Sequence, residues 1–245
     1  MAAPPPIVRD ICEHLLDELD SALPGLVVGF FLTGSAVLGD WRAGRSDIDF
    51  IGATARPACP EEAEQLRRVA AAASRGLGGQ KIDGHWLADL SAPPPPGVDV
   101  AVALRTLALH GAAIRGAIPS DIWCDPGAVR AALLANLDDY WAPWLRAARR
   151  PLTSRGLAML GGWAPAWGVL GLARIAYTLR TDDIASKAAA GRWAMAEFPG
   201  HWAAIGEALR LRAGGGAPVY PHPFARRREM LAAMDALLAS CRGLR

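Results

Sequence analysis

The 245-residue sequence has no marked excess of charge of either sign. Its formal net charge is +2, and the basic residues are scattered along the chain instead of forming blocks. Proteins that bind nucleic acid usually carry a basic patch or stripe, because their contacts to phosphates depend on positive charge. The charge pattern therefore predicts that nucleic acid is not a partner.

Paired cysteines and long apolar runs are also missing. The four cysteines are widely spaced and include no Cys-x-x-Cys pair: Cys12, Cys59, Cys124 and Cys241. This spacing argues against a zinc site and against a disulfide framework. The most nearly apolar stretch, 157–172, is too short and too interrupted by Gly and Pro to span a membrane. The start of the chain lacks the basic and apolar regions of a signal peptide. We expect a soluble, cytoplasmic monomer with no membrane partner.

A buried strand and a Gly-Ser turn stand near the start of the chain. Hydrophobic residues make up 52% of the sequence, enough for one large core or two modest ones. The apolar run 26–32 is broken only by Gly29 and predicts a buried strand. Gly34-Ser35 follows it, and a glycine there lets the backbone come close to a ligand.

Two aspartates open the next apolar run. Ser46 precedes Asp47-Ile48-Asp49. Because side chains alternate along a strand, Asp47 and Asp49 are expected on the same face, with Ile48 packed behind them. Adjacent carboxylates repel each other, and a bound cation relieves that repulsion. Beside a Gly-Ser turn suited to phosphate oxygens, the pattern favours magnesium carrying a nucleoside triphosphate. The alternative is an ordinary hairpin with two solvent-facing aspartates.

These motifs resemble the signature of the nucleotidyltransferase superfamily, which includes DNA polymerase β. Gly-Ser-Ala-Val-x-Gly followed by Ser-Asp-Ile-Asp is most similar to the aminoglycoside 3''/9-type adenylyltransferases, enzymes of antibiotic resistance. The resemblance implies that Asp47 and Asp49 bind magnesium. It also implies that Gly34, Ser35 and Ser46 contact ATP.

The superfamily chemistry also requires a third carboxylate on a neighbouring strand. In the similar adenylyltransferases this residue is a glutamate that acts as general base on the substrate hydroxyl. Residues 81–90 are expected to form a third strand, which makes Asp83 our candidate for the base and for a third metal ligand. Asp99 is the alternative, because it lies in the strand-like run 98–102. Asp83 is preferred because its distance from Asp49 accommodates one crossing helix and little else.

The fold is expected to be α+β: a nucleotidyltransferase α/β domain over residues 1–120, with a small mixed sheet, followed by a helical bundle over 121–245. Apolar residues four positions apart predict a helix over 7–22, and Pro60 begins another that ends near Gly76–Gly79. From Pro126 onward every pattern is helical. One helix is expected over 127–149, kinked by Pro143, and four more over 165–179, 185–198, 199–212 and 226–242.

A second motif lies in the helical half. Leu172-Ala173-Arg174 is followed, thirteen residues after the arginine, by Lys187 in Ala185-Ser186-Lys187. The similar adenylyltransferases carry the same pair of motifs, and the resemblance implies that Arg174 and Lys187 bind the triphosphate across a domain cleft. Ser186 can cap a helix, but a lysine in the first turn opposes the helix dipole unless an anion lies nearby. Alternatively, Asp182 or Asp183 pairs with the lysine, or Asp183 caps this helix.

The sequence therefore predicts magnesium-dependent transfer of AMP from ATP to a hydroxyl group of a small molecule, with an aminoglycoside as the leading acceptor. An aminoglycoside is a polycation, which acidic residues or aromatic faces can receive. The family's acidic residues ahead of the Leu-Ala-Arg helix are missing here, and four residues are candidates to replace them: Trp163, Trp167, Asp138 and Asp139. The alternatives are a nucleotidyltransferase for another metabolite or for a protein, and a catalytically silent nucleotide-sensing module.

Overall fold

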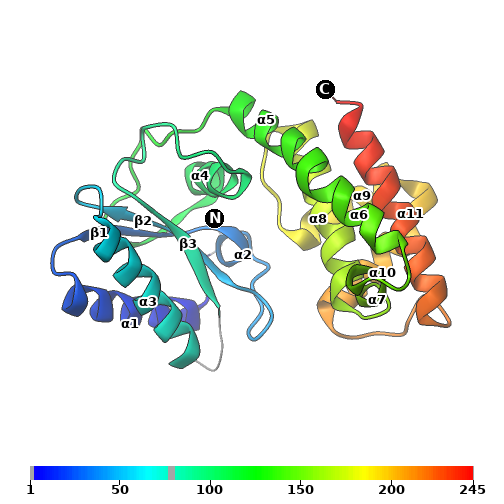
Figure 1. Ribbon diagram of the computed structural model, residues 1–245, viewed down its shortest axis with the longest axis horizontal. Helices are drawn as coiled ribbons and strands as arrows, with labels where there is room; N and C mark the ends of the chain where they lie inside the picture. The colour runs from blue at the N-terminus through cyan, green and yellow to red at the C-terminus, as the bar shows by residue number, and fades with distance from the viewer. Residues whose placement is uncertain (1–2, 77–80, 245) are drawn as a thin grey trace. The chain divides into compact units, whose positions relative to one another are not determined.

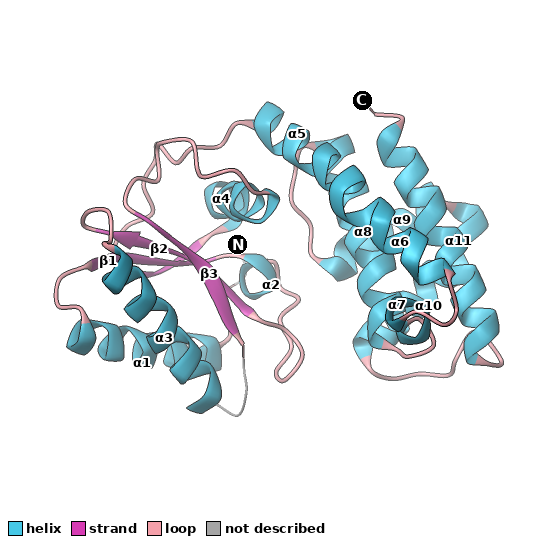
Figure 2. Cartoon of the chain, viewed as in Figure 1, coloured by secondary structure: helices cyan, strands magenta, loops and turns pink. Residues whose placement is uncertain are grey.

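The computed structural model describes residues 3–76 and 81–244 and divides them into two compact units (Figure 1). The first unit ends at Val129 and the second begins at Arg130. The first contains a small sheet with helices, and the second is helical (Figure 2). The predicted α+β fold class is confirmed. The boundary expected from the change in sequence pattern, near residue 120, lies a short distance before the one that the contacts define.

The first unit begins with a helix and alternates between helices and strands. Its elements are α1 (Pro6–Ala22), β1 (Val27–Leu32), α2 (Gly34–Val37), β2 (Ile48–Thr54), α3 (Pro60–Gly76), β3 (Ile82–Leu87), α4 (Val98–His110) and β4 (Ala112–Arg115). The predicted strands 26–32 and 81–90 correspond to β1 and β3, and the helix expected from residue 7 is α1. The end predicted for the helix beginning at Pro60 extends into Leu77–Gly79, which lies outside the described residues.

The four strands form one mixed sheet in the order β3-β2-β1-β4. The central strand β1 pairs antiparallel with β2 and with β4, whereas β2 and β3 run parallel. The parallel pair is joined by α3, as expected, because a crossover between parallel strands needs a long connection. This topology places the beginnings of β2 and β3 at the same edge of the sheet.

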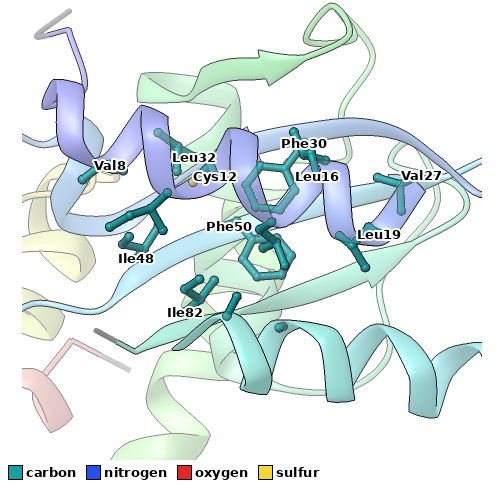
Figure 3. Close-up of a cluster of buried hydrophobic side chains, with 14 of the residues drawn as sticks. Val8, Cys12, Leu16, Leu19, Val27, Phe30, Leu32, Ile48, Phe50 and Ile82 are labelled. Carbon is teal, nitrogen blue, oxygen red and sulfur yellow. The ribbon is translucent and has the colours of Figure 1, made fainter. Parts of the chain in front are cut away.

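Helices cover both faces of this sheet, which explains why β1 is apolar on both sides. Figure 3 shows α1 lying over one face, with Phe30 and Phe50 beneath it. Their rings are stacked, with centroids 4.5 Å apart. On the opposite face, Phe31 and Ile51 pack with apolar residues of α4. Successive residues of a strand alternate between faces, so the two layers follow directly from the sequence of β1 and β2.

Two segments of the first unit differ from the sequence-based expectation. The strand-like run 98–102 forms the beginning of α4, because Val100, Leu104 and Leu107 lie at helical spacing and are buried against the sheet. Ala112–Arg115, for which the sequence predicted no strand, forms the edge strand β4. Its residues Ala-Ala-Ile-Arg carry little strand signal of their own, and the pairing with β1 determines the conformation.

The second unit is built around one long apolar helix. Its elements after α5 (Pro126–Asn136) are the π-helical turn η1 (Leu137–Trp141), α6 (Ala142–Arg149), α7 (Ser154–Ala158), α8 (Trp163–Thr181), α9 (Lys187–Glu197), the 3-10 turn η2 (Pro199–His201), α10 (Trp202–Ala213) and α11 (Pro223–Arg242). Helix α8 packs against α9, α10 and α11. Because neighbouring helices cover it on several sides, α8 is not amphipathic. Its buried residues, many of them Ala and Leu, lie on several sides of the helix.

The helix predicted over 127–149 is continuous but changes its winding. The π-helical turn η1 stands between α5 and α6, directly before Pro143 in the first turn of α6. Proline has no N–H to donate and its ring crowds the preceding turn, so local rewinding relieves the conflict. Within the described residues, no helix is both long and apolar enough to cross a membrane.

Candidate active site

The turn after β1 brings glycine and carboxylate into direct contact. Gly34 has a φ of +58°, a left-handed conformation that strongly favours glycine. A Cβ atom at this position would lie 1.9 Å from Oδ2 of Asp49, so the carboxylate would have to move. The Thr33 amide also donates a hydrogen bond of 2.9 Å to the carbonyl oxygen of Asp49. Gly34 is therefore required both by its backbone angle and by the carboxylate against it.

The three predicted carboxylates lie at the shared edge of β2 and β3. Asp49 is the register partner of Asp83 on the neighbouring parallel strand, and Ile48 is the partner of Ile82. Ile48 and Ile82 are buried on the face covered by α1 and α3, so Asp49 and Asp83 belong to the opposite face. Asp47, just before β2, and Asp83 are both substantially exposed.

The alternative third carboxylate lies elsewhere in the first unit. Asp99 is an exposed residue in the first turn of α4 and not part of a strand. The arrangement predicted for the third carboxylate, on the strand next to the Asp-x-Asp strand, is therefore found at Asp83. The base role itself stays a prediction.

A lysine that the sequence analysis did not identify lies among these carboxylates. Nζ of Lys81 donates a hydrogen bond of 2.6 Å to Oδ2 of Asp83 and lies 3.7 Å from Oδ2 of Asp47. The hydrogen bond to Asp83 raises the pKa of Lys81, partial burial opposes this, and the charges of Asp47, Asp83 and Asp49 raise it further. The signal that could have revealed it is its position two residues before Asp83, on the same face of the strand.

The donor atoms at this edge suit magnesium. Among the described residues, no group of three or more His, Cys, Asp or Glu side chains is arranged to hold a metal ion. Magnesium, however, commonly takes only one or two protein carboxylates and completes its coordination with water and substrate phosphates. Asp47 and Asp49 meet that requirement, and the Lys81 ammonium shows that the cluster already attracts a cation.

The loop between α2 and β2 is held by its own hydrogen bonds. The buried Ser46 hydroxyl accepts a hydrogen bond of 3.1 Å from the Arg42 amide, and the Ser46 amide donates to the Arg42 carbonyl. The Ser35 carbonyl accepts from the amide of buried Asp40, which lies 3.7 Å from Nε of Arg42. Ser46 thus closes the turn that leads into Asp47, and its contact with ATP stays a prediction.

In the second unit, the motif residues lie on two adjacent helices. Arg174 is on α8, half-buried, and Lys187 is the first residue of α9. The Ser186 side chain caps α9 by accepting from the Ala189 amide at 3.1 Å. The carboxylate of Asp183 accepts from the Ile184 amide. The predicted serine cap is confirmed.

Five aromatic side chains cluster where η1 and α6 meet the start of α8: Tyr140, Trp141, Trp144, Trp163 and Trp167. Trp167 stacks on buried Trp141, with ring centroids 4.7 Å apart, and on Trp163 at 5.5 Å. Trp163 is 73% exposed. Asp139 beside Tyr140 is exposed, whereas Asp138 forms an ion pair with Arg242.

The fold agrees with the one that the sequence motifs suggested. Over 95% of its length the chain resembles spectinomycin adenyltransferase AAD(9) from Enterococcus faecialis, whose crystal structure contains ATP and spectinomycin. The TM-score is 0.67 at 16% sequence identity, and 98% of that chain is covered. At this identity the similarity shows the fold alone.

The family is indicated by the second unit. Residues 154–236 match the family model described as aminoglycoside adenylyltransferase, C-terminal domain. The resemblance predicted from the motifs is thereby confirmed. A comparison with curated protein sequences finds no match.

Proposed function

We propose that the chain transfers AMP from ATP to a hydroxyl group of an aminoglycoside. The observation that carries the proposal is the carboxylate edge, where Asp49 and Asp83 are register partners and Asp49 packs against Gly34. Two findings support it: the match of 154–236 to the adenylyltransferase C-terminal domain, and a fold shared with an enzyme solved with ATP and spectinomycin. We expect the reaction to take place in the cytoplasm, in a monomer that does not bind nucleic acid.

Each residue of the first unit has a distinct role in this proposal. Asp47, Asp49 and Asp83 would hold magnesium, and Gly34, Ser35 and Ser46 would contact ATP. Magnesium, when bound, neutralises charge on the triphosphate. Asp83 accepts the proton of the acceptor hydroxyl. The hydroxyl oxygen then forms a bond to the α-phosphorus, and the bond from that phosphorus to the bridging oxygen breaks and releases pyrophosphate.

The second unit contributes cationic groups for the nucleotide. Arg174 and Lys187 are proposed to bind the triphosphate, each through charge-assisted hydrogen bonds. Lys187 stands in the first turn of α9, where a positive charge opposes the helix dipole. An anion bound beside this turn would compensate both the dipole and the lysine, which is the reason for assigning the residue to ATP rather than to the fold.

The acceptor is proposed to bind at the exposed end of the aromatic cluster. An aminoglycoside carries several ammonium groups, and a cation over a tryptophan face is attracted by the ring quadrupole. Trp163 presents such a face, its other side being stacked on Trp167. Exposed Asp139 adds a negative charge nearby in the same unit. These groups replace the acidic residues that the family carries ahead of the Leu-Ala-Arg helix.

The test is release of pyrophosphate from ATP and magnesium with a panel of aminoglycosides that includes spectinomycin and streptomycin. The expected result is release that depends on one or more members of the panel, together with an adenylylated product in the mass spectrum. An Asp47→Asn, Asp49→Asn double variant is the control and should be inactive. Release with another hydroxylated metabolite or a protein would replace the acceptor assignment. ATP binding without any transfer would indicate a nucleotide-sensing module instead.

A further inference from the structure

Lysine is rare in this chain. The sequence contains only two lysines, Lys81 and Lys187, and its other basic residues of full charge are arginines. Lys187 already belongs to the proposed nucleotide site, whereas Lys81 has no role in the reaction described above. Lys81 is therefore the one lysine of the chain to which the proposed reaction gives no role.

Carboxylate oxygens surround the ammonium group of Lys81, as they would surround a bound metal ion. Its ammonium donates to Asp83 at 2.6 Å and lies 3.7 Å from a carboxylate oxygen of Asp47. Asp49 is the register partner of Asp83 on the neighbouring strand. One cation therefore lies against two of the three carboxylates to which the reaction assigns magnesium and the acceptor proton.

We propose that Lys81 is the resident counter-cation of the carboxylate edge and competes with the divalent metal for it. The inference rests on the proposed function, since it takes Asp47 and Asp49 as the metal ligands. Without metal, the ammonium partly neutralises the negative charge of the carboxylates and donates its hydrogen bond to Asp83. When metal binds, the ammonium moves away from Asp47 and leaves Asp83 able to accept a hydrogen bond from the acceptor hydroxyl.

The exposure of the lysine makes this exchange inexpensive. The side chains of Lys81 and Asp83 are each 59% exposed, so either partner can be resolvated at small cost. A buried ion pair could not open in this way, because each separated charge would remain out of water. The edge is therefore built for exchange of one cation for another rather than for a permanent ion pair.

The test measures binding of manganese, a paramagnetic substitute for magnesium, to the full chain without nucleotide. Electron paramagnetic resonance gives the dissociation constant for the wild type and for Lys81→Met, Lys81→Arg and Arg67→Met. Removing a charge that competes for the same carboxylates should lower the constant in Lys81→Met about tenfold, which corresponds to ~1.4 kcal/mol. Lys81→Arg keeps the charge and should stay within about threefold of the wild type.

Arg67→Met is the matched control, because Arg67 is an exposed residue of the same unit, 66% accessible, in an ion pair with Glu64 on α3. It should bind manganese as the wild type does. The inference is overturned if Lys81→Met has the wild-type constant, or if Arg67→Met tightens binding equally, since that would be a general effect of net charge. Tight binding by Lys81→Met where the wild type binds too weakly to measure would support it.

Asp49→Asn separates this inference from the proposed function. If it abolishes manganese binding while Lys81→Met changes nothing, the metal site stands and the role of Lys81 is wrong. If Asp49→Asn binds manganese as the wild type does, the metal lies elsewhere and both proposals fail.

A second readout follows the lysine directly. With lysine labelled by 15N, the side chains give only two Nζ resonances, which Lys187→Arg assigns. Magnesium should shift the Lys81 resonance and leave that of Lys187 in place. A Lys81 resonance unmoved at saturating magnesium would contradict the exchange.

Discussion

One cluster of charged side chains in the first unit differs in exposure from one in the second. In the first unit, Asp47, Asp83 and Lys81 are 48%, 59% and 59% exposed, and they meet at the edge of the sheet. In the second unit, the Glu207 side chain is fully buried and lies between Arg210 and Arg226. Exposed charges stay hydrated and can exchange partners, whereas a buried charge must keep its partners permanently. Exposed charged side chains are thus available to bind ligands, whereas buried ion pairs stabilise the fold.

The buried carboxylate of Glu207 has several hydrogen-bond partners. It accepts hydrogen bonds of 2.6 and 2.7 Å from Arg210 and one of 3.2 Å from the Val219 amide. Burial by itself raises the pKa of this carboxyl, but the hydrogen bonds from Arg210 and Val219, with the charges of Arg210 and Arg226, bring the pKa below its ordinary value. The site thus connects α10 to the loop before α11 and to α11 itself.

The largest expected effect is on activity, from Asp49→Asn in the open cluster. Loss of a metal-binding carboxylate should lower kcat by about three orders of magnitude or more. Asparagine has the same shape and relieves repulsion from the neighbouring carboxylates, so the apo protein should unfold at nearly the wild-type temperature. Steady-state kinetics and calorimetry measure the two quantities. An active variant would remove the assignment of Asp49 to the reaction.

Asp83→Asn should lose turnover but keep the nucleotide. If Asp83 is chiefly the base, kcat should fall by about 10²–10⁴, while the affinity for magnesium–ATP changes little. Isothermal titration calorimetry beside the rate distinguishes these effects. Asp99→Asn is the control, since Asp99 is an exposed helical residue, and it should be fully active. The reverse pattern would make Asp99 the functional carboxylate.

Glu207→Gln tests whether the buried ion pairs of the second unit stabilise the fold. Removing the charge leaves two largely buried arginines without their anion, which should lower the free energy of unfolding by about 3–5 kcal/mol. Because the folded pKa of Glu207 is lowered, its contribution is complete above the unfolded value of about 4.3 and disappears as the pH falls through the folded pKa.

Unfolding in urea from pH 3 to pH 7 measures both predictions. The wild type should lose stability over the acid end of this range, and Glu207→Gln should lose less. Equal stability of the two proteins at pH 7 would show that the buried cluster is not structural.

Lys187→Ala sharpens the comparison within the second unit, because it separates a ligand-binding charge from a structural one. It should weaken ATP binding by about 1.5–3 kcal/mol, the range for hydrogen bonds to charged groups. The melting temperature without ligand should change little, since a lysine at a helix start contributes little to stability. Stabilisation by magnesium–ATP should be visibly smaller than in the wild type. A destabilised variant that binds ATP normally would make Lys187 structural.

The smallest effect is expected at the aromatic cluster. Trp163→Ala should raise KM for the acceptor by a factor of about two to five, because exposed cation–π contacts amount to ~0.5–1 kcal/mol. KM for ATP should not change. Trp202→Ala is a control, since this tryptophan on α10 is also exposed and lies outside the cluster. An equal rise in both variants would exclude a specific role for Trp163.

Much of the site could be predicted from the sequence because its signals are local. The apolar run of β1, the glycine at position 34 and the alternation around Ile48 need only neighbouring residues to be interpreted. The same holds for the serine cap of α9, which depends on Ser186 and the amide three residues later. The helix α1 followed from apolar spacing, and the start of α3 followed from Pro60.

The remaining features depend on contacts between distant parts of the chain. The run 98–102 alternates like a strand, yet it is helical because Val100, Leu104 and Leu107 can then cover the sheet together. Edge strand β4 exists because β1 offers it free backbone groups.

Lys81 shows most clearly the difference between what the sequence determines locally and what the tertiary structure decides. The sequence alone determined the strand, the turn and the carboxylates that make up the candidate site. Only the tertiary structure decided that Lys81, 34 residues beyond Asp47, would lie 3.7 Å from its carboxylate. The physical reason is that β2 and β3 are parallel neighbours in a fixed register, and register is a property of the pair of strands rather than of either sequence.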